Sequence, residues 1–91
     1  MSTRVAVPAS LRRLTGGNAV IEGTGATVHA LFTDLDSRHP GLKAKLYDDS
    51  GRIQKFAAVF INGRDIRTLQ GGDTALTGNE EINIVTAIAG G

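Results

Sequence analysis

The sequence has 91 residues, with ten lysines and arginines against nine aspartates and glutamates, which gives a formal net charge of +1. A chain of this length forms one domain with a small core, so it has little room for a deep substrate pocket. The balanced charge argues against a nucleic-acid-binding protein, and an aromatic content of 4% argues against a base-stacking surface. Because cysteine is absent, disulfides, cysteine zinc sites and thiol nucleophiles are excluded.

The N-terminal residues and the hydropathy pattern indicate where the protein acts. Met1-Ser2-Thr3-Arg4 leads directly into Val5-Ala6-Val7-Pro8, without the apolar run of a secretory signal. No stretch approaches the roughly 20 apolar residues of a membrane helix. We therefore expect a cytoplasmic protein that does not associate with membranes, and the absence of cysteine fits a reducing compartment.

The first part of the chain predicts a hairpin. Val5-Ala6-Val7 and Ala19-Val20-Ile21-Glu22 are short apolar runs that favour strands. Thr15-Gly16-Gly17-Asn18 lies between them and is a strong turn signal. The two runs are therefore expected to pair in an antiparallel manner.

A helix is predicted over residues 27–38. Its apolar residues recur at i, i+3, i+4 and i+7, which is the buried stripe of a helix: Val28, Leu31, Phe32 and Leu35. Thr27 can cap the first turn, and Asp34 can pair with Arg38 one turn later. Pro40-Gly41 ends the helix, because proline disfavours helical geometry in the residue before it.

The second half predicts mainly strands. Residues 42–47 favour a short helical turn and residues 48–51 a loop. The strongest strand signal covers residues 55–61, and Asn62-Gly63 after it predicts a tight hairpin to a returning strand at residues 65–67. Alternation over residues 82–86 predicts the last strand.

This order of elements predicts an α+β fold of the β-grasp type, a mixed and mostly antiparallel sheet with one main helix on one face. The domain is expected to cover residues 1–86, with a flexible tail over residues 87–91. Strand alternation assigns Val59, Ile61, Ile82 and Ile84 to the core. Phe60, Val85 and Ala58 then lie on the open face, where exposed apolar side chains would form a partner-docking patch. The reversed assignment would place Phe60 in the core.

The polar residues give weak signals for catalysis. His29 falls on the polar side of the predicted helix and His39 lies beside its end, and neither has an evident partner to make it a base. Asp48-Asp49 belongs to an Asp-Asp-Ser-Gly run that is typical of loops, and a hard metal ion would need further oxygen ligands. No catalytic or metal-binding residue is predicted, so we do not expect an enzyme.

Two other patterns suggest ligands only faintly. Gly23-x-Gly25-x-x-Val28 resembles the start of a dinucleotide fingerprint, but it lacks the third glycine and the chain is too short for a doubly wound sheet. We interpret it as a strand-to-helix turn. The basic pairs Arg12-Arg13 and Lys43/Lys45 are interpreted as solvated surface, because acidic residues are interspersed and aromatic residues are few.

The sequence closes with Ala87-Ile88-Ala89-Gly90-Gly91 after the last predicted strand. Two glycines make a thin segment, because they lack a Cβ atom and adopt backbone conformations closed to other residues. Such a segment can pass through a narrow channel and present a terminal carboxylate to the active site of another protein. A carboxylate is a poor electrophile, so the partner must first activate it.

With these features the sequence resembles the ubiquitin-like sulfur carriers of the MoaD/ThiS superfamily, and most closely their CysO type. The resemblance spans nearly the whole chain. It rests on Leu11 with Thr15-Gly16-Gly17, on the helix 27–38, on Gly71-Gly72 and above all on the ending 87–91. Thr86 departs from the pattern, since many relatives have proline just before the tail.

The resemblance implies a mechanism and a set of partners. A MoeB/ThiF-like adenylyltransferase uses ATP and magnesium to convert the Gly91 carboxylate into an acyl-adenylate, and a sulfur source then leaves a thiocarboxylate there. The tail from Ala87 to Gly91 enters the partners' active sites, and the chain itself binds no cofactor. The sulfur acceptor is a pyridoxal-phosphate cysteine synthase in the CysO type, and a molybdopterin, thiazole or thiosugar synthase in other relatives. A carrier that visits several enzymes is expected to be a monomer.

Two alternatives stay open at this stage. A ubiquitin-like modifier would share the adenylation step and then be joined through Gly91 to lysines of other proteins. A plain β-grasp binding domain would keep its function without Gly90-Gly91.

Overall fold

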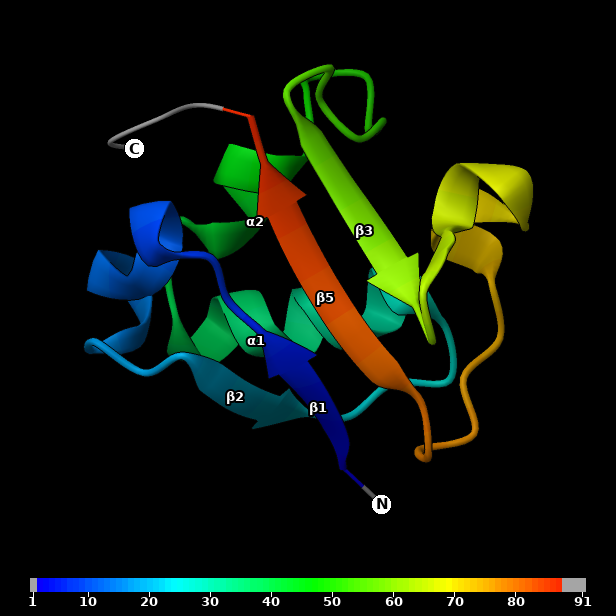
Figure 1. Cartoon of the computed structure of the whole chain (residues 1–91), viewed down its shortest axis with the longest axis horizontal. Helices are drawn as coiled ribbons and strands as arrows, with labels where there is room; N and C mark the ends of the chain where they lie inside the picture. Colours follow the sequence, from blue (N-terminus) through cyan, green and yellow to red (C-terminus); the bar gives the residue numbers. More distant parts are fainter. Residues whose placement is uncertain (1, 88–91) are drawn as a thin grey trace.

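The computed structural model describes residues 2–87, which form five strands, two α-helices and three 3-10 helices (Figure 1). In chain order these elements are β1 (Thr3–Ala6), η1 (Ala9–Thr15), β2 (Val20–Gly23), α1 (Val28–Arg38), α2 (Leu42–Leu46), β3 (Ala57–Ile61), β4 (Arg64–Asp65), η2 (Ile66–Thr68), η3 (Gly71–Asp73) and β5 (Glu81–Thr86). The strands form one sheet in the order β2-β1-β5-β3-β4, and α1 crosses one face of it. This is the predicted β-grasp arrangement.

The N-terminal hairpin is confirmed, with β1 and β2 antiparallel and Val5 opposite Ile21. β1 covers residues 3–6 rather than the predicted 5–7, because Thr3 still pairs with Gly23. The 3-10 helix η1 was not predicted. Its Leu11 is buried, and Gly16 ends it in the left-handed conformation with a φ of 66° that glycine adopts without strain.

Helix α1 ends at Arg38 as predicted and begins at Val28, one residue after the predicted start, because Thr27 is its N-cap. The Thr27 hydroxyl oxygen accepts a hydrogen bond from the backbone N–H of Ala30 at 3.1 Å, which caps the first turn. The Arg38 guanidinium lies 2.7 Å from the Asp34 carboxylate. The predicted apolar stripe is buried against the sheet, and α2 follows as the predicted short helical turn.

The hairpin at Asn62-Gly63 is also confirmed, with positive φ angles of 50° and 85° at its two central residues, as a type I′ turn requires. β3 starts at Ala57 rather than Lys55. The prediction of a returning strand over 65–67 is wrong, since β4 ends at Asp65. The Asp65 carboxylate accepts a hydrogen bond from the backbone N–H of Arg67, and this contact caps η2 instead.

Strand β5 lies in the middle of the sheet, parallel to β1 and antiparallel to β3. Its Ile82 and Ile84 are buried together with Val59 and Ile61 of β3, as predicted. They pack in one core cluster with Leu31, Phe32 and Leu35 of α1. The alternating residues of β3 and β5 therefore form the opposite, open face of the sheet.

Candidate functional site

The predicted docking patch lies on this open face. Ala58 of β3 stands directly opposite Val85 of β5. Val85 is 48% exposed and Ala58 is partly exposed, so the pair presents apolar surface to solvent. Both residues lie toward the end of β5 that leads into residues 88–91, and the patch is therefore adjacent to the last described residue, Ala87.

Phe60 is on the predicted face but is half-buried rather than exposed. It belongs to an inner strand, with Asn83 of β5 opposite it on one side and Asp65 of β4 opposite it on the other. These neighbours flank the ring, and they account for its reduced exposure. Alternation predicted the face correctly, while the degree of exposure depends on the strand order.

Thr86 and Ala87, at the end of β5, are held by hydrogen bonds from both sides of this strand. The Ser10 hydroxyl of η1 lies 2.8 Å from the Thr86 hydroxyl, and the backbone N–H of Ala87 donates to the carbonyl of Phe56 at 2.7 Å. Ala87, the first residue of the predicted tail, is thus hydrogen-bonded on the β3 side, directly after β5 ends at Thr86. Ile88, Ala89, Gly90 and Gly91 lie outside the described residues.

Thr86, for which the resemblance led us to expect proline, makes a local side-chain contact with Ser10. Its partner Ser10 was not predicted from the sequence, because η1 has no sequence signal and a single serine forms no pattern. The contact becomes visible only when the parallel pairing of β1 with β5 brings residues 10 and 86 together.

The opposite end of the open face is charged. Arg4 of β1 is flanked by Glu22 of β2 and Glu81 of β5, each directly opposite it in the pairing register. All three residues are exposed. The open face thus changes along β5, from charged side chains where the strand starts to the Ala58–Val85 pair where it ends.

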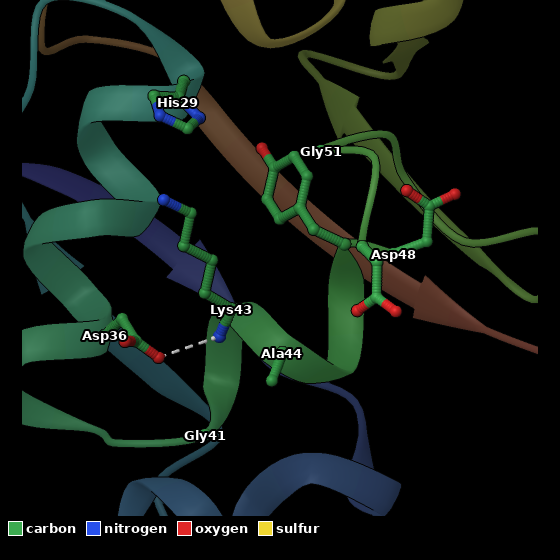
Figure 2. A pocket seen from close by; sticks show the side chains of 9 residues that line it. His29, Asp36, Gly41, Lys43, Ala44, Asp48 and Gly51 are labelled. Carbon is green, nitrogen blue, oxygen red and sulfur yellow. Dashed lines mark hydrogen bonds between the residues drawn. The ribbon is translucent and has the colours of Figure 1, made fainter.

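A cavity of about 480 Å³ opens between α1, α2 and the loop that follows α2 (Figure 2). Its lining includes the singled-out residues His29, Asp48 and Asp49, together with Asp36 and Lys43. The polar groups are engaged locally: the Asp36 carboxylate accepts from the backbone N–H of Lys43 at 3.1 Å. The Lys43 ammonium in turn donates to the Thr33 hydroxyl at 3.0 Å.

The carboxylate of Asp48 closes the loop, as the sequence indicated. It accepts hydrogen bonds from the Ser50 hydroxyl and from the backbone N–H groups of Ser50 and Arg52, and these contacts lower the pKa of Asp48. His39 forms the C-cap of α1, where its backbone N–H donates to Leu35. Within residues 2–87, no three histidine or carboxylate side chains come close enough together to hold a metal ion.

Tyr47 was not singled out from the sequence and is the one unusual group at this cavity. Its ring packs edge-on against His29, with 6.1 Å between the ring centres. Its hydroxyl is buried without a hydrogen-bond partner among the described residues, and burial raises its pKa. The Tyr47 ring also packs edge-on against Phe32, so it contributes to the packing of the end of α2 against α1.

Gly23 and Gly25 serve packing rather than phosphate binding. A Cβ atom on Gly23 would lie 2.6 Å from the Leu35 side chain, and one on Gly25 would lie 2.4 Å from the backbone nitrogen of Leu31. Only glycine lets the turn after β2 approach the start of α1 this closely. The interpretation of Gly23-x-Gly25 as a strand-to-helix turn is confirmed.

Residues 5–91 match the ThiS family, and the chain belongs to that family. A full-length relative is the sulfur carrier protein CysO of Mycobacterium tuberculosis, with 32% identity and complete coverage of both chains. The small archaeal modifier protein 3 of Haloferax volcanii is 32% identical over 72% of this chain and 71% of its own length.

Solved structures agree with the fold and its topology. The chain superimposes on CysO in the crystal structure of the Amycolatopsis orientalis BexX/CysO complex with a TM-score of 0.90 and 35% identity, covering 98% of this chain and 99% of that one. The fold is therefore the ubiquitin-like β-grasp. No helix within residues 2–87 has both the length and the hydropathy needed to cross a bilayer.

Proposed function

We propose that this protein is a sulfur carrier whose Gly91 carboxylate is converted into a thiocarboxylate by partner enzymes. The observation that carries the proposal is a ThiS-family match that runs through residue 91 and includes Gly90-Gly91, which follow the central strand β5. Support comes also from full-length relatives named sulfur carrier protein CysO. The protein acts as a substrate of these enzymes, without a catalytic site of its own.

The first reaction activates the carboxylate. A carboxylate oxygen of Gly91 attacks the α-phosphorus of ATP, the bond to the β-phosphate oxygen breaks, and pyrophosphate leaves. Magnesium and ATP are bound by the adenylyltransferase, for which we propose a MoeB/ThiF-like enzyme. The mixed anhydride that results makes the Gly91 carbonyl carbon electrophilic, which a free carboxylate is not.

The second reaction installs sulfur. Hydrosulfide attacks the carbonyl carbon of the acyl-adenylate, AMP leaves, and one proton is released as the thiocarboxylate forms. No electrons are transferred, so a cysteine-free carrier suffices for this step. The sulfur atom then attacks an electrophilic carbon held by the acceptor enzyme, and water cleaves the thioester to restore the Gly91 carboxylate.

The chain contributes docking and positioning. The Ala58–Val85 pair, with half-buried Phe60 beside it, is proposed to be the apolar anchor that partner enzymes cover. The contacts of Thr86 and Ala87 hold the end of β5 next to this anchor. A docked partner thereby receives the residues that follow Ala87 at a fixed place on its surface.

The intact mass of the protein purified from its native host without reducing agents tests the proposal. A species heavier by the difference between sulfur and oxygen, mapped to the C-terminal peptide, is the expected result. A chain lacking Gly90-Gly91 is the matched control and should show only its unmodified mass. The proposal is overturned when wild-type protein stays unmodified after incubation with ATP, sulfide and the adenylyltransferase encoded in the same genome.

A second candidate function is favoured by the similarity to small archaeal modifier protein 3. In this case Gly91 would form isopeptide bonds with lysines of other proteins, after the same adenylation. Peptides carrying a Gly-Gly remnant on lysine, found by mass spectrometry of a protease-digested lysate, would support the modifier. A thiocarboxylate without such peptides supports the carrier alone.

A further inference from the structure

The net charge of +1 conceals a separation of charge along the sheet. Residues 5–21, 53–64 and 82–87 contain no aspartate or glutamate. These segments include η1, the approach to β3 with β3 itself, and all of β5 beyond Glu81. The end of the sheet at which β5 finishes is therefore built from chain segments without carboxylate side chains.

Three cations lie on the segments that hold this end of β5. Arg12 and Arg13 belong to η1, whose Ser10 contacts Thr86. Lys55 precedes Phe56, whose carbonyl accepts the hydrogen bond from Ala87. Arg13 and Lys55 are exposed, and the Arg12 side chain is anchored by a bond from its Nε to the Val7 carbonyl at 3.1 Å.

These cations are not neutralised by neighbours. The two ion pairs among residues 2–87 are Arg38–Asp34 and Arg67–Asp65, which involve none of them. Asp48 and Asp49, on the loop between α2 and β3, line the cavity beside α1 and α2 and form no ion pair with these cations. Arg12, Arg13 and Lys55 thus form an unpaired group, here called the basic collar, on both sides of the end of β5.

We infer that the basic collar docks on an acidic protein surface that surrounds the active-site entrance of the adenylating enzyme. The segments that carry the collar contact Thr86 and Ala87, the two residues that follow Val85, so the collar lies on either side of the strand end next to the apolar Ala58–Val85 pair. An apolar centre with a charged rim is typical of protein–protein interfaces. A nucleic acid is a less suitable partner than an acidic protein surface, because three cations form only a small electrostatic footprint. Among the described residues, no exposed aromatic cluster could stack on bases. The inference rests on the proposed function and adds the chemistry of the partner surface.

Rim charges act mainly on the rate of encounter and on its salt dependence. Arg13→Glu and Lys55→Glu should each raise the KM for this protein in ATP–pyrophosphate exchange about threefold to tenfold at low ionic strength, with kcat unchanged. High ionic strength should remove most of the difference, because exposed charges are screened. The enzyme in the assay is the MoeB/ThiF-like adenylyltransferase encoded in the same genome.

Arg64→Glu is the matched control. Arg64 is exposed on β4, beyond the opposite end of β3, and its reversal changes the net charge by the same amount. The KM of this variant should stay within about twofold of the wild-type KM, because surface positions outside an interface contribute little to binding. Circular dichroism of all three variants checks that the fold is retained.

The results distinguish a failure of this inference from a failure of the proposed function. If wild-type protein supports exchange but Arg13→Glu and Lys55→Glu have its KM, the inference is overturned and the proposed function stands. The same holds if Arg64→Glu raises the KM as much as they do. A wild-type protein that supports no exchange overturns both. Submicromolar binding of a labelled RNA oligonucleotide at physiological salt, lost in the collar variants, would assign the collar to nucleic acid and also overturn the inference.

Discussion

The hydroxyl oxygens of Ser10 and Thr86 lie 2.8 Å apart, although 76 positions separate the two residues in the chain. The contact joins the 3-10 helix that follows β1 to the last residue of β5. It is partly buried, so water competes with it less than at an open surface. The 3-10 helix η1, which carries Arg12 and Arg13 of the basic collar, is thereby fixed against β5.

The Ser10–Thr86 bond should contribute measurably to stability. In a double-mutant cycle with Ser10→Ala and Thr86→Val, we expect a coupling free energy of about 0.5–1.5 kcal/mol, the usual net value of such a bond. Urea unfolding of the four proteins measures it. Strictly additive effects of the two substitutions would mean that the hydroxyls do not interact.

The apolar patch can be tested separately from the fold. Val85→Asp should weaken binding to the adenylating enzyme at least tenfold, because a charge is placed where an apolar contact is expected. Val20→Asp is the matched control, since Val20 is 43% exposed on the edge strand β2 and Val85 is 48% exposed. Isothermal titration calorimetry gives both dissociation constants, and equal weakening in the two variants would contradict a patch localised at Val85.

Gly25 should be intolerant of even the smallest side chain. A Cβ atom there would lie 2.4 Å from the Leu31 nitrogen and 2.7 Å from the Ala30 carbonyl carbon, and helix backbone cannot move aside cheaply. We expect Gly25→Ala to lower the free energy of unfolding by about 1–3 kcal/mol.

Gly72→Ala provides the control for Gly25→Ala. The added Cβ would lie 3.5 Å from the His29 Cβ, which is an ordinary van der Waals distance. The expected change is within about 0.5 kcal/mol. Urea denaturation of the two variants side by side tests the pair, and equal effects would contradict the close approach of the turn to α1.

Acid stability should depend on Asp34. The backbone N–H of Thr24 and the Arg38 guanidinium hydrogen-bond its carboxylate and lower its pKa below the ordinary value of 3.8. A lowered pKa means that the folded protein binds this proton less readily than the unfolded chain. The stabilisation is therefore present above pH 3.8 and is lost as the pH falls through the folded-state pKa.

Asp34→Asn should accordingly be less stable than wild type at pH 7, with the difference shrinking below pH 3.8. Urea midpoints measured at pH 7 and at pH 3 provide the check. A deficit that is the same at both values would show that the substitution acts through packing rather than through charge.

Periodic and locally capped elements were predictable from the sequence. The helix was predicted because the spacing of Val28, Leu31, Phe32 and Leu35 and the cap at Thr27 point to the same structure. Asn62-Gly63 predicted its hairpin for a comparable reason, since the turn geometry requires two residues that tolerate positive φ. Strand alternation likewise placed Val85 on the open face.

Features that depend on distant contacts were not predictable. η1 has no helical periodicity, and it is held by Leu11 in the core and by the Ser10–Thr86 contact. The prediction of a strand over 65–67 was wrong because the Asp65 carboxylate accepts a hydrogen bond from the backbone N–H of Arg67. This local hydrogen bond competes with strand pairing. Arg12-Arg13 was interpreted as solvated surface and Lys55 was not singled out, since only the fold brings η1 and the start of β3 to the same end of the sheet.

The parallel pairing of Val5 with Ile82 has a consequence for how the protein matures. The middle of the sheet is completed by β5, which follows the other four described strands in the chain, so these contacts of high sequence separation form late. Until then β1 and β3 each expose an unpaired edge, which invites aggregation. Because Val85 lies on β5, the proposed docking patch is complete only after this strand has paired with β1 and β3.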